Sequence, residues 1–327
     1  MDSDKTFARI LGSGIYNLDT NVVRVYPDGP GSRRFTETVL GDEVGGTCGN
    51  VMCILAGLGL ETYPQACLDD SPEGLRITED LKRFGCDTRF VTNTPDGGTS
   101  LLRVTRKRFP DGSMKVSVRA GSPGGSRFPK RRFLRVRDQA PAFVQALQED
   151  FVPEFYFFDD PAAGHRYVAG ALRERGTIVY FEPARVETNA DLESVRRSDI
   201  VKFSNENIPD ASFADGFRDK LFVQTLGKEG LRYKFLDGDW KTLPPVVNAH
   251  VVDTEGAGDA TTSAIIFGIA RSGKRFRDLN ETELVRILTE AQRFASESVS
   301  RMGTKASPEA EKAAAAFKLL KVDKIKD

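Results

Sequence analysis

The sequence lacks a long hydrophobic run, an excess of charge of either sign, and more than a few cysteines and histidines. No apolar run approaches the roughly 18 residues that cross a bilayer, so we expect no membrane span. The 47 lysines and arginines balance 47 aspartates and glutamates, which gives no general attraction for nucleic acid or anionic membranes. Four cysteines without a C-x-x-C pair and two histidines argue against a zinc cage. The polar N-terminus lacks a signal-peptide pattern, so we expect reduced thiols and a cytoplasmic protein.

Short, dense, β-prone runs alternate with segments of helical length along most of the chain. These runs lie at 7–11, 155–158, 177–181, 199–203 and 221–225. Such alternation is typical of a parallel sheet that is covered by helices on both faces. We therefore predict one α/β domain over residues 1–327, a three-layer αβα sandwich with a mainly parallel central sheet.

Two other segments, approximately 16–44 and 98–120, have a different pattern, in which apolar residues alternate with polar and charged ones. This pattern predicts short strands with one exposed face, and Asp111-Gly112 indicates a hairpin turn. We expect the two segments to form a discontinuous β-sheet lid over a site. Exposed strand edges on such a lid favour a homodimer through the lid.

Residues 101–137 hold 12 lysines and arginines, so the neutral total conceals a polarised layout. The stretch is compatible with a solvated loop and lid edge, which is the usual fate of charge runs. Alternatively, one or two of Arg103, Arg106 and Arg108 face the cleft and pair an anionic substrate. Nucleic-acid binding by residues 127–137 is the third and least favoured reading, because no known module surrounds them.

The stretch from Val251 to Gly268 carries the most chemistry. A short β-like run enters a glycine turn, and a helix leaves it. Gly256, Ala257 and Gly258 can expose backbone N–H groups at the helix start, where the helix dipole also favours an anion. Asp259 follows in the first helical turn, where its carboxylate can accept a proton from an attacking hydroxyl. The pattern predicts phosphoryl transfer, whereas a P-loop is absent and Thr261 interrupts a dinucleotide-binding G-x-G-x-x-G.

The stretch D-T-x-G-A-G-D at 253–259 resembles the C-terminal signature of the ribokinase-like, or PfkB, carbohydrate kinases. Three further segments resemble family elements in the same order: G-G-x-x-G-N at 45–50, T-L-G-x-x-G at 225–230, and R-x-G-T at 301–304. Asn17 and Asp19 lie after the first predicted strand, where the family binds sugar hydroxyls. The resemblance therefore extends over nearly the whole chain.

The resemblance implies an ATP-dependent, Mg²⁺-requiring kinase for a small sugar or sugar acid. It assigns Asp259 as catalytic base and Gly256, Ala257 and Gly258 as anion hole. It assigns the acceptor side to Asn17, Asp19, Gly45, Gly46 and Asn50, to which the basic stretch adds Arg106 for an anionic group. It assigns the nucleotide side to Thr225, Gly227, Gly230, Gln292, Ser204 and Glu206. It assigns a monovalent cation, K⁺ in this reading, to Asp253, Glu255, Ser298, Arg301, Gly303 and Ser307.

Two stretches depart from the family pattern. Ser204 and Asn207 stand where the family's N-x-x-E has Asn and Glu, so either Glu206 substitutes or Mg²⁺ is held more through ATP phosphates. The usual Asp-Pro-Asn is replaced by Glu182-Pro183-Ala184. These changes leave two alternatives open, a nucleoside kinase of the same fold and a non-catalytic nucleotide-binding sensor or scaffold.

Overall fold

The computed structural model describes residues 8–120, 131–247 and 251–300. Within these residues the main sheet has nine strands in the order β13-β12-β11-β10-β9-β8-β1-β4-β5. The strands from β11 through β5 pair in parallel, and β12 and β13 continue the sheet antiparallel. Their bounds are β1 Arg9–Ser13, β4 Glu61–Leu68, β5 Val91–Asn93, β8 Phe155–Phe158, β9 Ile178–Phe181, β10 Ile200–Ser204, β11 Leu221–Thr225, β12 Leu231–Phe235 and β13 Lys241–Leu243.

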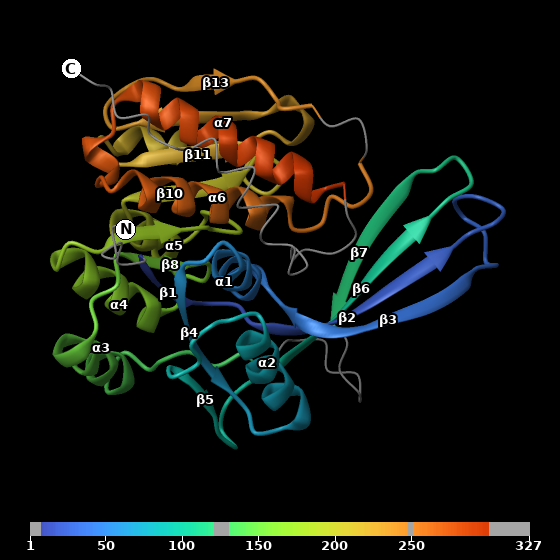
Figure 1. The fold of residues 1–327 in the computed structure, drawn as a ribbon, viewed down its shortest axis with the longest axis horizontal. Coiled ribbons are helices and arrows are strands. Elements are labelled where there is room, and N and C mark those ends of the chain that lie inside the picture. The colour runs from blue at the N-terminus through green and yellow to red at the C-terminus, as the bar shows by residue number, and fades with distance from the viewer. Residues whose placement is uncertain (1–7, 121–130, 248–250, 301–327) are drawn as a thin grey trace, which may run out of the picture.

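Helices cover both faces of this sheet (Figure 1). Residues of α1 (Thr47–Gly57), α2 (Pro72–Arg83), α6 (Ala257–Ser272) and α7 (Glu281–Ser298) belong to the buried cluster on one face. Residues of α3 (Gln139–Asp150), α4 (Ala163–Glu174) and α5 (Asn189–Arg196) belong to the cluster on the other. The α/β sandwich predicted from the alternating pattern is confirmed.

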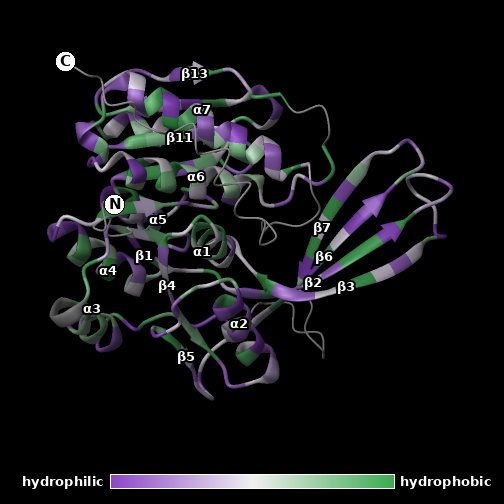
Figure 2. Cartoon of the chain, viewed as in Figure 1, coloured by the Kyte–Doolittle hydropathy of each residue, from purple (hydrophilic) through white to green (hydrophobic). Residues whose placement is uncertain are grey.

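The strand β8 shows why these strands read as unbroken apolar runs. Phe155 and Phe157 join the buried cluster that contains α6, whereas Tyr156 and Phe158 join the cluster that contains α4. Successive side chains of a strand point to opposite faces, so a sheet covered on both sides needs apolar residues at every position. Figure 2 shows the same hydrophobic colouring along β11 and α6, with hydrophilic residues toward the outside.

The strands β2 (Asn17–Val25), β3 (Thr36–Gly45), β6 (Ser100–Arg108) and β7 (Met114–Ala120) form a separate four-stranded sheet, here called the small sheet. Its order is β3-β2-β6-β7, with β2 and β6 parallel and the outer pairs antiparallel. Figure 1 shows it projecting to one side of the sandwich, with its base next to α1. Its strands overlap the two segments that the alternating pattern marked, with β3 ending at Gly45, one residue beyond the first segment.

Two further sequence predictions can be compared with the described residues. No helix among the described residues is long and apolar enough to cross a membrane. Arg301, Gly303 and Ser307, three members of the expected cation site, lie outside the described residues.

Candidate active site at the carboxyl edge of the sheet

The carboxyl ends of the parallel strands meet along one edge of the main sheet, and most of the predicted site residues gather there. In such sheets this edge is where ligands bind. Asp159 follows β8, Glu182 follows β9, and Ser204 and Thr225 end β10 and β11. The small sheet supplies Asn17, Asp19 and Gly45 from β2 and β3, and the helices α1 and α6 start at the same edge.

Asp259 lies in the first turn of α6, beside the glycine loop Gly256–Gly258. Gly256 adopts a left-handed conformation with φ of 80°, which glycine tolerates best, and no side chain caps the helix. The first N–H groups of an α-helix have no partner within the helix, so this end can receive an anion. The amide Nδ2 of Asn50, on α1, donates a 2.7 Å hydrogen bond to the Asp259 carboxylate and orients it.

Several charges act on the Asp259 carboxyl group. Burial raises its pKa well above the usual range, and the negative charges of Glu182 and Glu255 raise it further. The hydrogen bond from Asn50 and the positive charge of Lys202 act in the opposite direction. A raised pKa brings a carboxylate closer to the proton affinity that a general base needs near neutral pH.

Lys202 links three elements at this edge. Its ammonium group lies 2.5 Å from Glu182 Oε1 and donates to the Gly258 carbonyl at 3.0 Å. The second oxygen of Glu182 accepts a hydrogen bond from Thr262 on α6 at 2.5 Å. The Lys202 side chain is 2% exposed, so the pair is desolvated and geometrically fixed. In the sequence Glu182 was a departure from the family pattern, and Lys202 was not among the predicted site residues.

Asp159 is a second residue for which the sequence reading assigned no role. Its two oxygens accept the N–H groups of Ile15 and Cys48, both at 2.9 Å, and so join the turn after β1 to the start of α1. Burial is the main cause that raises the pKa of Asp159 to about 7, with a further contribution from the charge of Asp160. Its position directly after the dense 155–158 strand was the available signal.

On the acceptor side, polar atoms are buried at the base of the small sheet. Asn17 pairs with Ser100 in the β2–β6 register, so both lie on one face. Asn17 Oδ1 and Ser100 Oγ are buried, and neither has a hydrogen-bond partner among the described residues. Because buried polar atoms are normally satisfied, these two are suited to a hydroxyl-bearing ligand.

Two glycines allow close approach at the same place. A side chain at Gly45 would put its Cβ 1.8 Å from Asp19 Oδ2, so only glycine lets the Asp19 carboxylate lie against that backbone. Gly46 precedes α1 with φ of 82°, and a Cβ there would meet the Ile15 carbonyl at 2.4 Å. Gly45 thus pairs with Asn17 and contacts Asp19, Gly46 precedes α1, and Asn50 in the first turn of that helix contacts Asp259.

On the side of β11, the predicted nucleotide residues flank a tight turn. Thr225 ends the strand, Gly227 and Gly230 have positive φ of 58° and 95°, and the Leu226 N–H donates to the Gly230 carbonyl at 2.8 Å. Gln292 on α7 donates to the Pro244 carbonyl at 3.2 Å. Ser204 ends β10, its hydroxyl accepts the Asn207 N–H, and Glu206 is exposed.

Arg106 does not fit the expectation that it faces an anionic substrate. Its guanidinium is 1% exposed and lies 2.5 Å from the carboxylate of Asp253, which is 0% exposed. It also donates to Asn21 at 2.8 Å. The arginine therefore joins β6 of the small sheet to the segment that leads into the glycine loop.

This pair also changes the expected cation site. The other oxygen of Asp253 accepts the Glu255 N–H at 3.1 Å, so the carboxylate is engaged within the protein. Ser298 donates to the Ala295 carbonyl. Asp253, Glu255 and Ser298 are the described members of the expected set, and each carboxylate oxygen of Asp253 has a partner within the protein.

The fold and this edge define a class, the ribokinase-like sandwich with a glycine loop at the start of a helix. The chain has a TM-score of 0.65 to Arabidopsis thaliana ribokinase complexed with ribose and ATP, at 19% identity, covering 97% of this chain and 99% of that one. It has a TM-score of 0.63 to Burkholderia thailandensis nucleoside kinase in complex with inosine, at 16% identity, covering 96% and 97%. At these identities the likeness shows the fold.

Sequence comparison narrows the class. Residues 189–311 match the model of the pfkB family carbohydrate kinases. The chain is 24% identical over 318 residues to an ATP-dependent ribose-1-phosphate kinase of Halopiger xanaduensis, covering 94% of this chain and 97% of the relative. The resemblance drawn from the motifs is confirmed: the segment 189–311, which includes the D-T-x-G-A-G-D stretch, matches the pfkB family carbohydrate kinases, and the relatives are named as sugar kinases.

Proposed function

We propose that this protein transfers the γ-phosphoryl group of ATP to a hydroxyl of a small neutral sugar, with Asp259 as general base. The observation that carries the proposal is the position of Asp259. Its carboxylate is held by Asn50 at 2.7 Å, and Asp259 lies three positions after the left-handed Gly256, in the first turn of the uncapped helix α6. A proton acceptor and an anion site are therefore adjacent, as transfer to a hydroxyl requires.

The reaction assigns a task to each group. The acceptor hydroxyl gives its proton to the Asp259 carboxylate as its oxygen forms a bond to the γ-phosphorus, while the bond from that phosphorus to the β-bridging oxygen breaks and ADP leaves. The N–H groups of the glycine loop stabilise the charge on the transferring phosphoryl oxygens. Lys202 holds the Gly258 carbonyl at 3.0 Å and so fixes the loop.

Mg²⁺ fits the chemistry of the donors at this edge, which are carboxylate and hydroxyl oxygens. The described residues contain no group of three or more His, Cys, Asp or Glu side chains arranged to hold a metal ion. Mg²⁺ usually takes one or two protein carboxylates and completes its shell with phosphates and water. We assign Ser204 and Glu206 as the protein-side donors, and the ion when bound would neutralise phosphate charge.

A neutral sugar is favoured over a sugar acid. The side chains at the acceptor side are Asn17, Ser100 and Asp19, so the charged one is negative and opposes a carboxylate. The arginine expected to balance an acid, Arg106, is occupied by Asp253. A nucleoside is the second candidate, supported by the likeness to a nucleoside kinase, because its ribose presents the same kind of hydroxyls.

A panel of acceptors tests this proposal. ADP release would be measured with pentoses, hexoses, keto-sugar acids, sugar phosphates and nucleosides. We expect turnover with a neutral sugar, and Asp259→Asn should reduce kcat by roughly 10²–10⁴-fold, the usual share of a general base. Unchanged folding of the variant, checked by circular dichroism, is the control. Turnover only with nucleosides would select the second candidate, and no turnover with any acceptor would favour a nucleotide-binding sensor.

The small sheet is assigned as the lid of this site and as a dimer contact. Both of its outer strands, β3 and β7, have a free edge among the described residues. Apolar side chains are exposed on it, including Val39 at 56%, Leu40 at 52% and Val118 at 47%. Two copies pairing through this sheet would cover these side chains. Light scattering should give twice the mass of 36.0 kDa, and a monomer at micromolar concentration would contradict it.

A further inference from the structure

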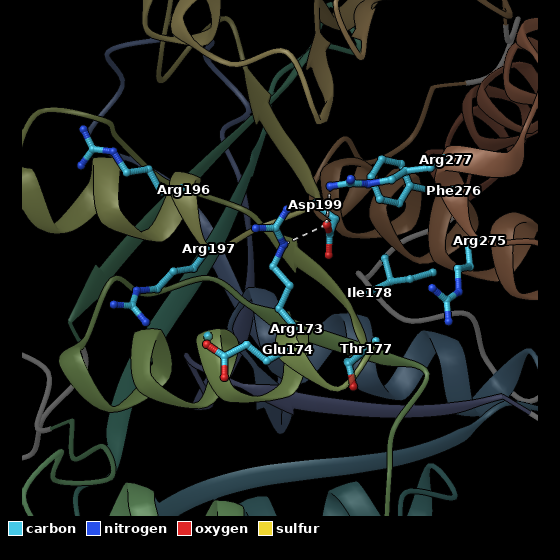
Figure 3. A pocket seen from close by; sticks show the side chains of 12 residues that line it. Arg173, Glu174, Thr177, Ile178, Arg196, Arg197, Asp199, Arg275, Phe276 and Arg277 are labelled. Carbon is cyan, nitrogen blue, oxygen red and sulfur yellow. Dashed lines mark hydrogen bonds and ion pairs between the residues drawn. The ribbon is translucent and has the colours of Figure 1, made fainter.

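A hollow lies at the edge of the main sheet opposite to the Asp259 site, where the strands begin. Its volume is about 500 Å³, and it is bordered by Thr177 and Ile178 at the start of β9 and Asp199 before β10. We call it the arginine pocket (Figure 3). Because β9 and β10 are parallel, Glu182 after β9 and Ser204 at the end of β10, both in the candidate active site, lie at the other end of the same strands. The arginine pocket is therefore distinct from the site around Asp259.

Arginines dominate its lining. They come from α4, from the end of α5 and from the segment after α6: Arg173, Arg196, Arg197, Arg275 and Arg277. The lining carboxylates are Glu174 and Asp199. Five positive against two negative side chains give an excess of three positive charges.

The ion pairs within the pocket neutralise only part of this positive charge. Arg173 and Arg277 approach Asp199 at 3.0 and 3.4 Å, and both also reach Asp219, at 3.1 and 3.3 Å. Figure 3 shows these two guanidiniums converging on Asp199. Asp219 lies outside the lining and is also paired with Lys220 at 3.4 Å, so it adds no net negative charge.

The remaining arginines have spare donors. Arg197 lies 4.0 Å from Glu193, a loose contact, and Arg196 pairs with the same carboxylate at 2.5 Å. Arg275 is exposed and makes no ion pair within the described part of the chain. Five N–H donors in a planar fork make each guanidinium a partner for phosphate oxygens.

The floor of the pocket leaves room for a ligand. It consists of small or apolar residues, Gly170, Gly176, Ile178 and Phe276. A side chain at Gly170 would place its Cβ 2.4 Å from Arg197 Nη1, so the glycine allows the guanidinium to lie across the helix α4. A hollow of this size is within the range of small-molecule sites.

We propose that the arginine pocket binds a small anion with two phosphate groups, held between Arg197 on one side and Arg275 on the other. Arg173 and Arg277, which are already turned inward by Asp199, line the space between them. A single phosphate can engage only one side, whereas a diphosphate can neutralise the excess charge from both. The same chemistry is offered by a nucleoside diphosphate and by a sugar bisphosphate.

Hydrogen exchange with the full-length protein tests the site by location. Inorganic pyrophosphate at millimolar concentration should slow amide exchange in peptides that cover 170–178, 196–199 and 275–278. Arg197→Gln/Arg275→Gln should abolish this local protection and weaken that binding about tenfold or more, the loss expected for charged hydrogen bonds. Arg33→Gln/Arg34→Gln, in the exposed turn between β2 and β3, removes the same charge elsewhere and should change nothing.

Other outcomes decide against the proposal or specify the ligand. Protection confined to residues 254–260, or equal protection of 170–178 in the pocket variant, would overturn it. Equal protection by pyrophosphate and monophosphate would overturn the two-phosphate part. Parallel titrations with ADP and with a sugar bisphosphate distinguish these two ligand classes. The class that slows amide exchange in 275–278 more strongly is the one that the pocket binds.

Discussion

The buried ion pair of Arg106 and Asp253 joins the small sheet to the segment before the glycine loop, and its contribution to stability can be tested by substitution. The two side chains are 1% and 0% exposed, and their nearest atoms are 2.5 Å apart. In Arg106→Met the carboxylate loses its charge partner while remaining buried. Removing one member of a buried ion pair typically costs about 3–5 kcal/mol. We expect the free energy of unfolding to fall by that amount.

The same strand offers a matched control. Arg103, also on β6, lies 2.5 Å from Glu37, but its side chain is 35% exposed. An exposed ion pair contributes about 0.2–1 kcal/mol, so Arg103→Met should cost no more than that. The two substitutions are chemically identical, and the two pairs have the same distance. A difference between them therefore measures the effect of burial.

A double substitution separates the pair from other effects of the change. Replacing a buried ion pair by apolar residues of similar volume is often neutral. Arg106→Met/Asp253→Leu should therefore recover about 2 kcal/mol or more relative to the sum of the single variants. Urea unfolding followed by circular dichroism reports both sheets, and fluorescence of Trp240, the one tryptophan, reports the main sheet. Equal costs for Arg106→Met and Arg103→Met, or strictly additive costs in the double variant, would refute the reasoning.

Two further predictions concern the reaction. The charge of Lys202 lowers the pKa of Asp259 and that of Glu182 raises it, so Lys202→Met should move the acid limb of kcat/KM to higher pH and Glu182→Gln should move it to lower pH. If both variants shift the acid limb in the same direction, or if neither shifts it, the acid limb does not report the titration of Asp259. Gly45→Ala places a Cβ 1.8 Å from Asp19 Oδ2, so KM for the acceptor should rise with KM for ATP unchanged; an equal rise in both would mean a general distortion.

Much of the main sheet could be predicted from the sequence because its strands are covered on both faces. That arrangement leaves a local trace, an unbroken apolar run such as 155–158, which needs no knowledge of neighbouring strands. The glycine loop before Asp259 is also visible in the sequence, because the left-handed backbone at position 256 favours glycine.

The partners of Asp259 could not be predicted in the same way. Lys202 meets Gly258 only because β10 lies beside β9 and under the start of α6, and the two residues are 56 positions apart. Asp159 holds Ile15 and Cys48, which are 144 and 111 positions away. A polar residue directly after a buried strand was a usable hint for Asp159, whereas Lys202 lies within the strand β10. What each side chain holds depends on the strand order, which the pattern of one strand does not contain.

The partners of Arg106, in the basic stretch, likewise depend on strand order and could not be predicted from the sequence. One reading of the basic stretch had Arg103, Arg106 or Arg108 facing the cleft and pairing an anionic substrate, because guanidinium groups suit carboxylate and phosphate. The parallel pairing of β6 with β2 brings Arg106 instead to Asn21 and Asp253. Asp253 in turn accepts the Glu255 N–H, one residue before Gly256. A movement of the small sheet would therefore pull on the backbone that shapes the glycine loop. The small sheet and the glycine loop are linked through the buried Arg106–Asp253 pair, so in the proposed reaction closure of the small sheet over an acceptor and placement of the phosphoryl group would depend on the same contact.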